Sequence, residues 1–196
     1  MPRREKPEPR RQQEIMDAAA AVFAEKGFHG ASTRDIADRL GIQQAGIYYY
    51  FKSKEAALAE VCRIGVEAFF ERATAIAECN STPAEKLASA VVAHLQPFQN
   101  MPNYVEVFHS ERRYLARDAR KPVRTLARKY EKLLEGLFRS GVEDGSFRAD
   151  LDCRLATLAM LGLCNSVMQW YRAENCNDID DIARQYATII VEGVRR

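Results

Sequence analysis

The chain has 196 residues, 47% of them hydrophobic, which is sufficient to bury a core without disulfides or metals. Its five cysteines form no CxxC pair, so we expect no metal site and no cofactor. No apolar run reaches the about 18 residues of a membrane span, and residues 1–11 lack the apolar segment of a signal peptide. We therefore expect a cytoplasmic protein. The net charge of +2 identifies no partner by itself, but residues 1–54 carry ten Lys/Arg against seven Asp/Glu and are the natural side to face a polyanion.

The N-terminal segment is predicted to be an arm followed by a helix. Residues 1–11 are rich in proline and charge, and they either remain a solvated tail or place their arginines on phosphates or in a minor groove. From Gln12 to Lys26, apolar residues recur at helical spacing and form one stripe. Gly27 then favours a left-handed residue that ends the helix, and residues 28–32 are predicted to be a loop.

A helix-turn-helix is predicted next. Ser32 is a good N-cap for a second helix, and Asp35, three residues later, favours a capping box. Gly41 ends this helix, and Ile42 points inward before a short third helix from Gln44 to Phe51. A helix, a glycine-centred turn and a short helix are typical of this DNA-binding motif.

The rest of the chain is predicted to be helical as well. Ser53 is the N-cap of a long helix over 54–78, and breaks at 100–102 and 143–146 interrupt the pattern that follows. No alternating pattern predicts a strand, so the predicted fold is all-α. The remaining helices are expected over 83–99, 103–116, 122–141, 152–173 and 178–194.

Two features of the short third helix are hard to explain by packing alone. Tyr48, Tyr49 and Tyr50 are consecutive, and helical neighbours point about 100° apart, so at least one ring faces outward and can contact phosphate or base. Alternatively, the rings cap a small core. Gly46 lowers the stability of this helix by roughly 1 kcal/mol relative to alanine. Either its missing side chain allows the backbone to approach a groove closely, or packing simply tolerates the low helix propensity.

Polar and basic residues flank this helix. Lys54 lies in the first turn of the next helix, where the helix dipole disfavours a cation unless a phosphate lies between them. Thr33 and Arg34, at the start of the second helix, are placed to clamp the next phosphate. Gln43 and Gln44 lead into the third helix, and glutamine can pair with adenine through two hydrogen bonds.

Residues 12–62 resemble the TetR family of bacterial regulators, through the apolar stripe of the first helix, TRDIADRLGI, the YYYF run and the SKE-A-L segment. After the flexible basic arm that composition predicts over 1–11, the resemblance implies an N-terminal three-helix helix-turn-helix domain over 12–53 and a C-terminal ligand-binding and dimerisation domain over 54–196. It also implies a dimer on near-palindromic double-stranded DNA. The family often has Ser, Thr or Lys at positions 43–46, so base preference does not transfer. The motif carries base and phosphate contacts onto Thr33, Arg34, Gln44, Ala45, Gly46, Tyr48, Tyr49, Tyr50 and Lys54.

The last two helices are predicted to form a homodimer. Residues 155–169 are apolar almost all round, so one face can line the subunit's own core while another meets the partner, helped by the small residues Ala159 and Gly162. In TetR-like regulators the last two long helices form a four-helix bundle with their symmetry mates, and the resemblance implies the same here. The two recognition helices would then lie roughly 34–36 Å apart.

A small-molecule inducer is expected in the C-terminal domain. SERRYL, EGLFRSGVEDGSFRADLD and NSVMQWYR resemble family members that regulate the catabolism of fatty acids and other CoA thioesters, which implies an acyl-CoA or a similar amphipathic acid. Asn165 lies in an apolar helix and either satisfies a backbone group or meets this ligand. Taken individually, most candidate ligand-binding residues are more simply explained as ordinary core residues. The candidate ligand-binding residues are Phe69, Phe98, Tyr104, Phe108, Arg112, Tyr130, Met160, Cys164, Asn165, Met168 and Trp170.

Residues 111–132 form a basic segment with nine Lys/Arg against three Asp/Glu. The segment is explained either as a solvated helix face or as an anion site, for example for the phosphates of an acyl-CoA.

Two other classes of function are weighed against a repressor released from its operator by a small molecule. An enzyme is disfavoured because His29, His94 and His109 belong to no recognisable nucleophile or metal motif, so no catalytic residue is expected. A helical protein-interaction module without DNA binding is the alternative. The tyrosine run and Lys54 argue against such a module.

Overall fold

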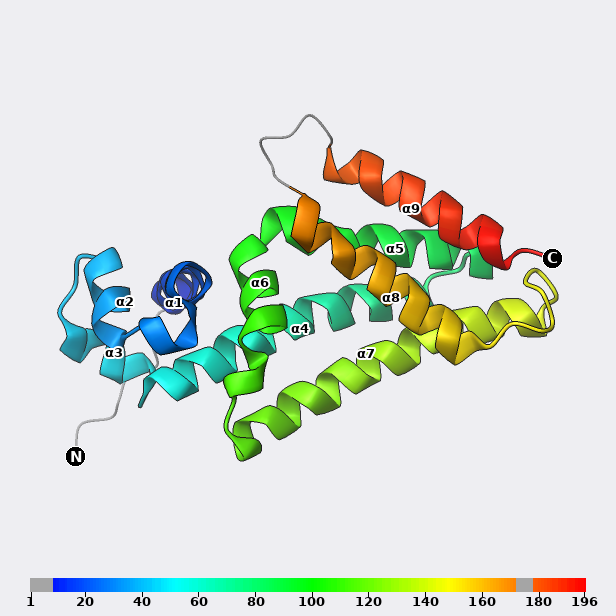
Figure 1. Cartoon of the computed structure of the whole chain (residues 1–196). Coiled ribbons are helices and arrows are strands. Elements are labelled where there is room, and N and C mark those ends of the chain that lie inside the picture. Colours follow the sequence, from blue (N-terminus) through cyan, green and yellow to red (C-terminus); the bar gives the residue numbers. More distant parts are fainter. Residues whose placement is uncertain (1–8, 172–177) are drawn as a thin grey trace. The chain divides into compact units, whose positions relative to one another are not determined.

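The computed structural model describes residues 9–171 and 178–196, and most of these residues are helical (Figure 1). The predicted all-α class is confirmed. No helix within the described ranges is long and apolar enough to cross a membrane. The elements are α1 (Pro9–Gly30), α2 (Thr33–Arg39), α3 (Gln44–Tyr50), α4 (Lys54–Glu78), α5 (Pro83–Asn100), α6 (Pro102–Ser110), the 3₁₀-helix η1 (Arg112–Tyr114), α7 (Arg117–Glu143), α8 (Cys153–Trp170) and α9 (Ile179–Val194).

The chain divides into two compact units. Within the described ranges, the N-terminal unit comprises the residues up to Val66 together with Asn103–Arg124, and the C-terminal unit comprises Glu67–Pro102 together with the described residues from Thr125 to Arg196. This division differs from the predicted functional domains, because α6 and η1 belong to the same compact unit as the helix-turn-helix. The functional boundary between residues 53 and 54 stays a prediction.

In the N-terminal unit, α1 carries the predicted apolar stripe into the core, with Ile15 and Ala19 fully buried. The helix is interrupted at Gly27, whose φ of 66° lies in the region that favours glycine, as expected for a residue that ends a helix. The predicted loop after Gly27 is wrong in its first part. Residues 28–30 form one further helical turn, which the hydrogen bond from the Ala31 N–H to the Gly27 carbonyl closes at 3.1 Å.

The helices around residue 111 also differ from the prediction. A single helix over 103–116 is wrong, because α6 ends at Ser110 and η1 follows, where the Tyr114 N–H donates to the Glu111 carbonyl at 2.9 Å. The prediction that the next helix begins at Pro122 is wrong as well, because α7 begins at Arg117. Pro122 is exposed inside α7, so water can satisfy the carbonyl that its missing N–H leaves unbonded.

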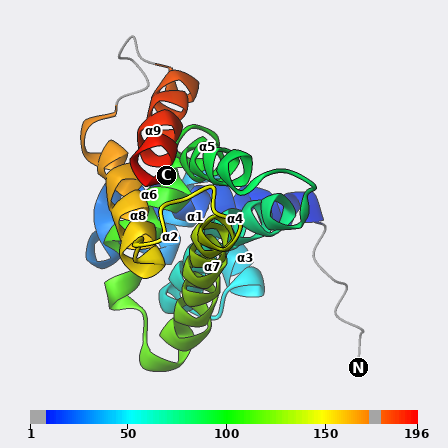
Figure 2. The same ribbon diagram turned by 90° about the vertical axis from the view of Figure 1, so that its right-hand side faces the viewer.

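In the C-terminal unit, α5, α8 and α9 lie side by side (Figures 1 and 2). Asp152 is the N-cap of α8, and α8 ends before Tyr171, whose backbone is extended. The predicted end of this helix at Ala173 lies outside the described residues. A Cβ at Gly141 of α7 would lie 2.2 Å from the buried Phe147 ring, so the close packing of this ring requires glycine.

Candidate nucleic-acid interface

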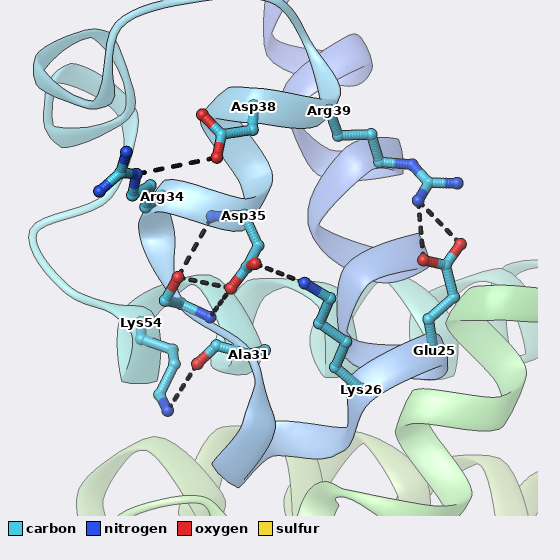
Figure 3. Close-up of polar contacts among 9 residues, drawn as sticks. Glu25, Lys26, Ala31, Arg34, Asp35, Asp38, Arg39 and Lys54 are labelled. Carbon is cyan, nitrogen blue, oxygen red and sulfur yellow. Dashed lines mark hydrogen bonds and ion pairs between the residues drawn. The ribbon is translucent and has the colours of Figure 1, made fainter.

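The first turn of α2 is fixed by its cap. The Asp35 N–H donates to Ser32 Oγ at 3.2 Å, and the Ser32 N–H donates back to Asp35 Oδ2 at 2.8 Å, which confirms the predicted capping box (Figure 3). Lys26 of α1 also donates to the Asp35 carboxylate. This hydrogen bond, and then those from Ser32, lower the pKa of Asp35 to about 2. The start of α2 is therefore tied both to its own cap and to α1.

The outer face of α2 carries exposed ion pairs. Arg39 lies 2.7 Å from Glu25, whereas Arg34 Nε lies 3.8 Å from Asp38 (Figure 3). The Arg34 side chain is 80% exposed, and a long, exposed ion pair contributes little free energy. Arg34 can therefore exchange this carboxylate for a phosphate at low cost.

Polar side chains connect α2 to α3. Gln44 Nε2 donates to Thr33 Oγ1 at 2.7 Å, and the Tyr48 hydroxyl lies 3.4 Å from the same oxygen. We call these residues the Thr33–Gln44–Tyr48 cluster. Thr33 is buried, whereas Gln44 and Tyr48 are exposed. The buried Thr33 hydroxyl therefore orients the polar groups of two exposed side chains.

The three tyrosines of α3 point in different directions, as their helical spacing requires. Tyr48 is 51% exposed and Tyr49 is 45% exposed, whereas Tyr50 is half-buried and meets the Tyr49 ring edge-on at 5.2 Å. The fully buried residue of α3 is Ile47. The helix therefore attaches to the N-terminal unit through Ile47 and presents two large polar rings to solvent.

Gly46 is exposed on α3, as are Ala45 on the same helix and Gln43, its N-cap. A Cβ built on Gly46 would meet only the end of the Ile42 side chain, at 3.5 Å, which is an ordinary van der Waals contact. The fold itself therefore does not require glycine at this position. That leaves close approach of another molecule as a physical reason for it.

Lys54, predicted to hold a phosphate, makes contacts within the N-terminal unit. Its ammonium group donates to the carbonyls of Phe28 at 2.8 Å and of Ala31 at 2.9 Å, and lies 4.4 Å from the centre of the Phe28 ring. The contact with Ala31 is visible in Figure 3. Sequence reasoning missed these contacts because they depend on the unpredicted turn at residues 28–30.

The predicted ligand-binding residues are divided between the two units. Tyr104, Phe108 and Arg112 belong to the N-terminal unit, where the Tyr104 hydroxyl donates to Asp17 at 2.8 Å and the Arg112 guanidinium lies 4.8 Å from the Phe108 ring centre. The other candidates belong to the C-terminal unit. Of these, Trp170 is 45% exposed and Met168 is half-buried, whereas Phe69, Phe98, Tyr130, Met160 and Cys164 are buried.

The core of the C-terminal unit contains a polar network that the sequence did not predict. His94 is 3% exposed; its Nδ1 lies 2.7 Å from the Tyr130 hydroxyl and its Nε2 lies 3.1 Å from Asn165 Oδ1. Because an amide oxygen only accepts, Nε2 carries the proton and Nδ1 accepts the hydroxyl proton. Burial lowers the pKa of His94 to about 4, so the ring is neutral, and Phe69 stacks on it at 4.9 Å.

A further polar group in this unit was missed by sequence reasoning. Arg72 Nη1 of α4 is buried and has no hydrogen-bond partner among the described residues. A buried donor of this kind normally pairs with an acceptor. Arg72 is therefore a candidate to bind an acceptor group of a ligand, although no pattern in the sequence distinguished it from the other arginines.

The surface of α8 and α9 is apolar and hollowed. A groove of about 420 Å³ lies between these helices, and it is lined by Leu155, Ala159 and Ile189, among other residues. Leu155 is 62% exposed, Ile189 is 58% exposed and Leu158, on the same helix as Leu155, is 46% exposed. These are large apolar groups that the C-terminal unit does not bury by itself.

Two family models match the chain. Residues 80–194 match the family described as tetracyclin repressor-like, C-terminal domain, and residues 15–61 match the family described as bacterial regulatory proteins, tetR family. The HTH-type transcriptional repressor KstR2 of Rhodococcus jostii (strain RHA1) is 29% identical over 185 residues, which cover 94% of this chain and 91% of that protein.

Two further relatives are similar over nearly the whole chain. The fatty acid metabolism regulator protein of Bacillus subtilis (strain 168) is 28% identical over 182 residues, which cover 92% of this chain and 94% of that protein. The solved structure of the ketosteroid transcriptional regulator KstR2 of Mycobacterium tuberculosis has a TM-score of 0.88 at 26% identity, and the match covers 98% of this chain and 97% of that one.

Proposed function

The chain belongs to the TetR family of bacterial transcription regulators, and we propose that it is a homodimeric repressor that leaves its operator when a small amphipathic acid binds the C-terminal domain. It is a regulator rather than an enzyme, as its relatives are. The observation that carries the DNA-binding proposal is the Thr33–Gln44–Tyr48 cluster, which holds polar groups in fixed positions on a helix-turn-helix and leaves them open to solvent. Since its target is chromosomal DNA, we place the protein in the cytoplasm.

In the proposed complex, α3 lies in a major groove of near-palindromic DNA. Gln44 faces the base edges, because its amide is already oriented by Thr33 and glutamine can bond adenine. Tyr48 and Tyr49 contact the sugar-phosphate backbone or bases through their exposed hydroxyls and rings. Arg34 and Lys54 contact phosphates on either side, and Gly46 allows α3 to approach the groove closely.

The proposed dimer forms through α8 and α9. The exposed Leu155, Leu158 and Ile189 side chains would be costly to leave in water on a monomer and are suited to the core of an interface. Ala159 and Gly162 are exposed on α8, where small residues allow helices to approach closely. The groove between α8 and α9 offers space for side chains of a second copy of this chain.

The proposed inducer is an acyl-CoA or a similar amphipathic acid. Its apolar part suits the buried aromatic and aliphatic side chains of the C-terminal unit, and Arg72 Nη1 is a buried donor for a carbonyl or carboxylate. The similarity to a fatty acid metabolism regulator protein and to the ketosteroid transcriptional regulator KstR2 favours this class of ligand. We propose that α4, one continuous helix from Lys54 to Glu78, transmits the change, and that ligand and DNA oppose each other through a coupling of typically about 1–3 kcal/mol.

The DNA-binding proposal is tested by fluorescence anisotropy of a labelled duplex taken from the promoter region beside the protein's own gene. We expect binding that weakens steeply with salt, and a loss of sequence preference in Gln44→Ala. Gln99→Ala, an exposed glutamine at the end of α5, is the matched control and should bind as the wild type does. A wild-type protein that ignores the duplex even at low salt would favour the interaction module without DNA binding.

The dimer and the inducer have separate tests. Sedimentation should show a dimer at micromolar concentration, and Ile189→Glu should convert it to a monomer, whereas Thr125→Glu, at an exposed position of α7, should not. Calorimetric titration with CoA thioesters and with the matching free acids should identify the ligand class. Arg72→Leu should weaken the binding of whichever ligand is found, and the absence of any binding across both panels would contradict the proposed inducer.

A further inference from the structure

Charged side chains from two other elements cap the helical turn at residues 28–30. Its first N–H belongs to Phe28 and has no partner within the turn, because α1 is interrupted at Gly27. Glu111 Oε2 accepts this N–H at 2.7 Å. At the other end, Lys54 Nζ donates to the carbonyls of Phe28 and Ala31. A carboxylate at the amino end and an ammonium at the carboxyl end both match the dipole of the turn.

The contact made by Glu111 is buried and reinforced by aromatic rings. Glu111 is 9% exposed and Phe28 is 8% exposed. Tyr114 of η1 stacks on the Phe28 ring, with the centroids 5.8 Å apart and the planes at 17°, and meets the His29 ring edge-on at 4.5 Å. The segment that ends α6 and forms η1 therefore holds the turn through a charge-assisted hydrogen bond and through ring packing.

The segment that presents Glu111 is itself fixed within the N-terminal unit. The Tyr104 hydroxyl ties the first turn of α6 to Asp17 of α1. A Cβ on Gly65 would lie 3.0 Å from the Tyr104 carbonyl, so α4 and α6 are in close backbone contact where they cross (Figure 1). Arg120 donates to two carbonyls at the end of η1, at 2.6 and 2.9 Å. Glu111 is thus anchored from both sides along the chain.

We propose that Glu111 is a positioning residue for DNA binding. Only Ala31 separates the turn that it caps from Ser32, the N-cap of α2, so the orientation of the turn decides where α2 and the Thr33–Gln44–Tyr48 cluster lie. This inference rests on the proposed function and adds a regulatory connection to it. Residues 103–124 are joined to the C-terminal unit at both ends, so they connect it to the helix-turn-helix by a route additional to α4.

The test uses the full-length protein and the labelled promoter duplex, at a temperature where circular dichroism shows every variant to be folded. Glu111→Ala is expected to weaken binding by about tenfold. The salt slope should not change, because Glu111 contacts no phosphate. Glu111→Gln, which keeps an oxygen acceptor, should restore part of the loss. Glu106→Ala removes an exposed carboxylate from α6, the helix that precedes Glu111, and should bind as the wild type does.

The outcomes separate this inference from the proposed function. If the wild type binds the duplex and folded Glu111→Ala binds it equally well, the inference is overturned and the proposed function stands; a lower melting temperature with unchanged affinity has the same meaning. If the wild type does not bind, the proposed function itself fails. Should Glu111→Ala not fold, hydrogen exchange over residues 27–36 in Glu111→Gln decides: faster exchange with weaker binding supports the role, and unchanged exchange and binding overturn it.

Discussion

The Thr33–Gln44–Tyr48 cluster and the network around His94 are built from similar groups, but they differ in what surrounds them. Gln44 and Tyr48 hydrogen-bond to neighbours and remain open to solvent, so they can exchange partners at little cost. His94 is 3% exposed and both of its ring nitrogens are bonded, so any change leaves buried polar groups unpaired. Exposure is therefore the property that separates the groups proposed for recognition from the groups that stabilise the fold.

The largest expected effect is on the buried side of this comparison. His94→Ala removes a ring that packs on Phe69 and leaves both the Tyr130 hydroxyl and the Asn165 amide without their partner. We expect the free energy of unfolding to fall by about 3 kcal/mol. Gln44→Ala, on the exposed side, should change it by less than about 0.5 kcal/mol. Urea unfolding at pH 7 measures both, and a similar loss in the two variants would break the comparison.

The pH dependence of stability tests the same network without removing its packing. The pKa of His94 is lowered by burial from 6.5 to about 4, so the folded state binds the proton less readily than the unfolded state. The stabilisation from the neutral ring is fully present above about pH 6.5 and is lost as the pH falls towards 4, by about 3 kcal/mol. His94→Gln should lack this part of the decline. An identical decline in wild type and variant, measured by urea unfolding from pH 7 to 4, would show that His94 does not titrate in this way.

Local patterns predicted those elements that depend on neighbours in the sequence. The capping box of Ser32 and Asp35, the helix-ending Gly27 and the bounds of α4 all follow from residues a few positions apart. The outward direction of Tyr48 and Tyr49 follows from the angle between successive helical residues. These features could be predicted because residues distant in the sequence are not needed to define them.

Features that depend on residues far apart in the chain could not be predicted from the sequence. Glu111 accepts from Phe28, which lies 83 residues away, and that contact accompanies the break between α6 and η1 where one helix was predicted. His94 pairs with Asn165 across 71 residues. The contacts of Lys54 with the carbonyls of Phe28 and Ala31 were not predicted either, because these carbonyls belong to a turn that the sequence pattern did not show.

The next largest expected effect concerns DNA binding by the exposed face of α3. Gly46→Ala should weaken operator binding by about tenfold, because a methyl group would stand between α3 and the groove. The same change should stabilise the fold by up to about 1 kcal/mol, since the site has room for a Cβ and alanine favours helix. Gly136→Ala is the matched control, because Gly136 is exposed in α7 with nothing within 4 Å of its Cβ position. It should stabilise similarly and leave binding unchanged; equal binding by both variants would argue against close approach at Gly46.

Lys54 is expected to contribute both to DNA binding and to the stability of the fold. Lys54→Ala should weaken binding to all duplexes and lower the slope of log affinity against log salt by about one, if the ammonium contacts a phosphate. It should also lower the free energy of unfolding by about 1 kcal/mol, because the carbonyls of Phe28 and Ala31 lose their cap. Salt series and urea unfolding separate these effects. Lower stability with an unchanged slope would restrict Lys54 to the cap.

The smallest expected effect concerns the charge beside Arg34. Asp38 lies 3.8 Å from Arg34 on the exposed face of α2, so Asp38→Asn should remove a repulsion towards phosphate and strengthen binding about twofold at low salt. The gain should vanish at high salt, because exposed charges are screened. Asp150→Asn is the control, since Asp150 forms a similar exposed pair with Arg148 at 3.7 Å in the C-terminal unit and should not affect binding. Weaker binding by Asp38→Asn would show that Asp38 holds Arg34 in the orientation that contacts DNA.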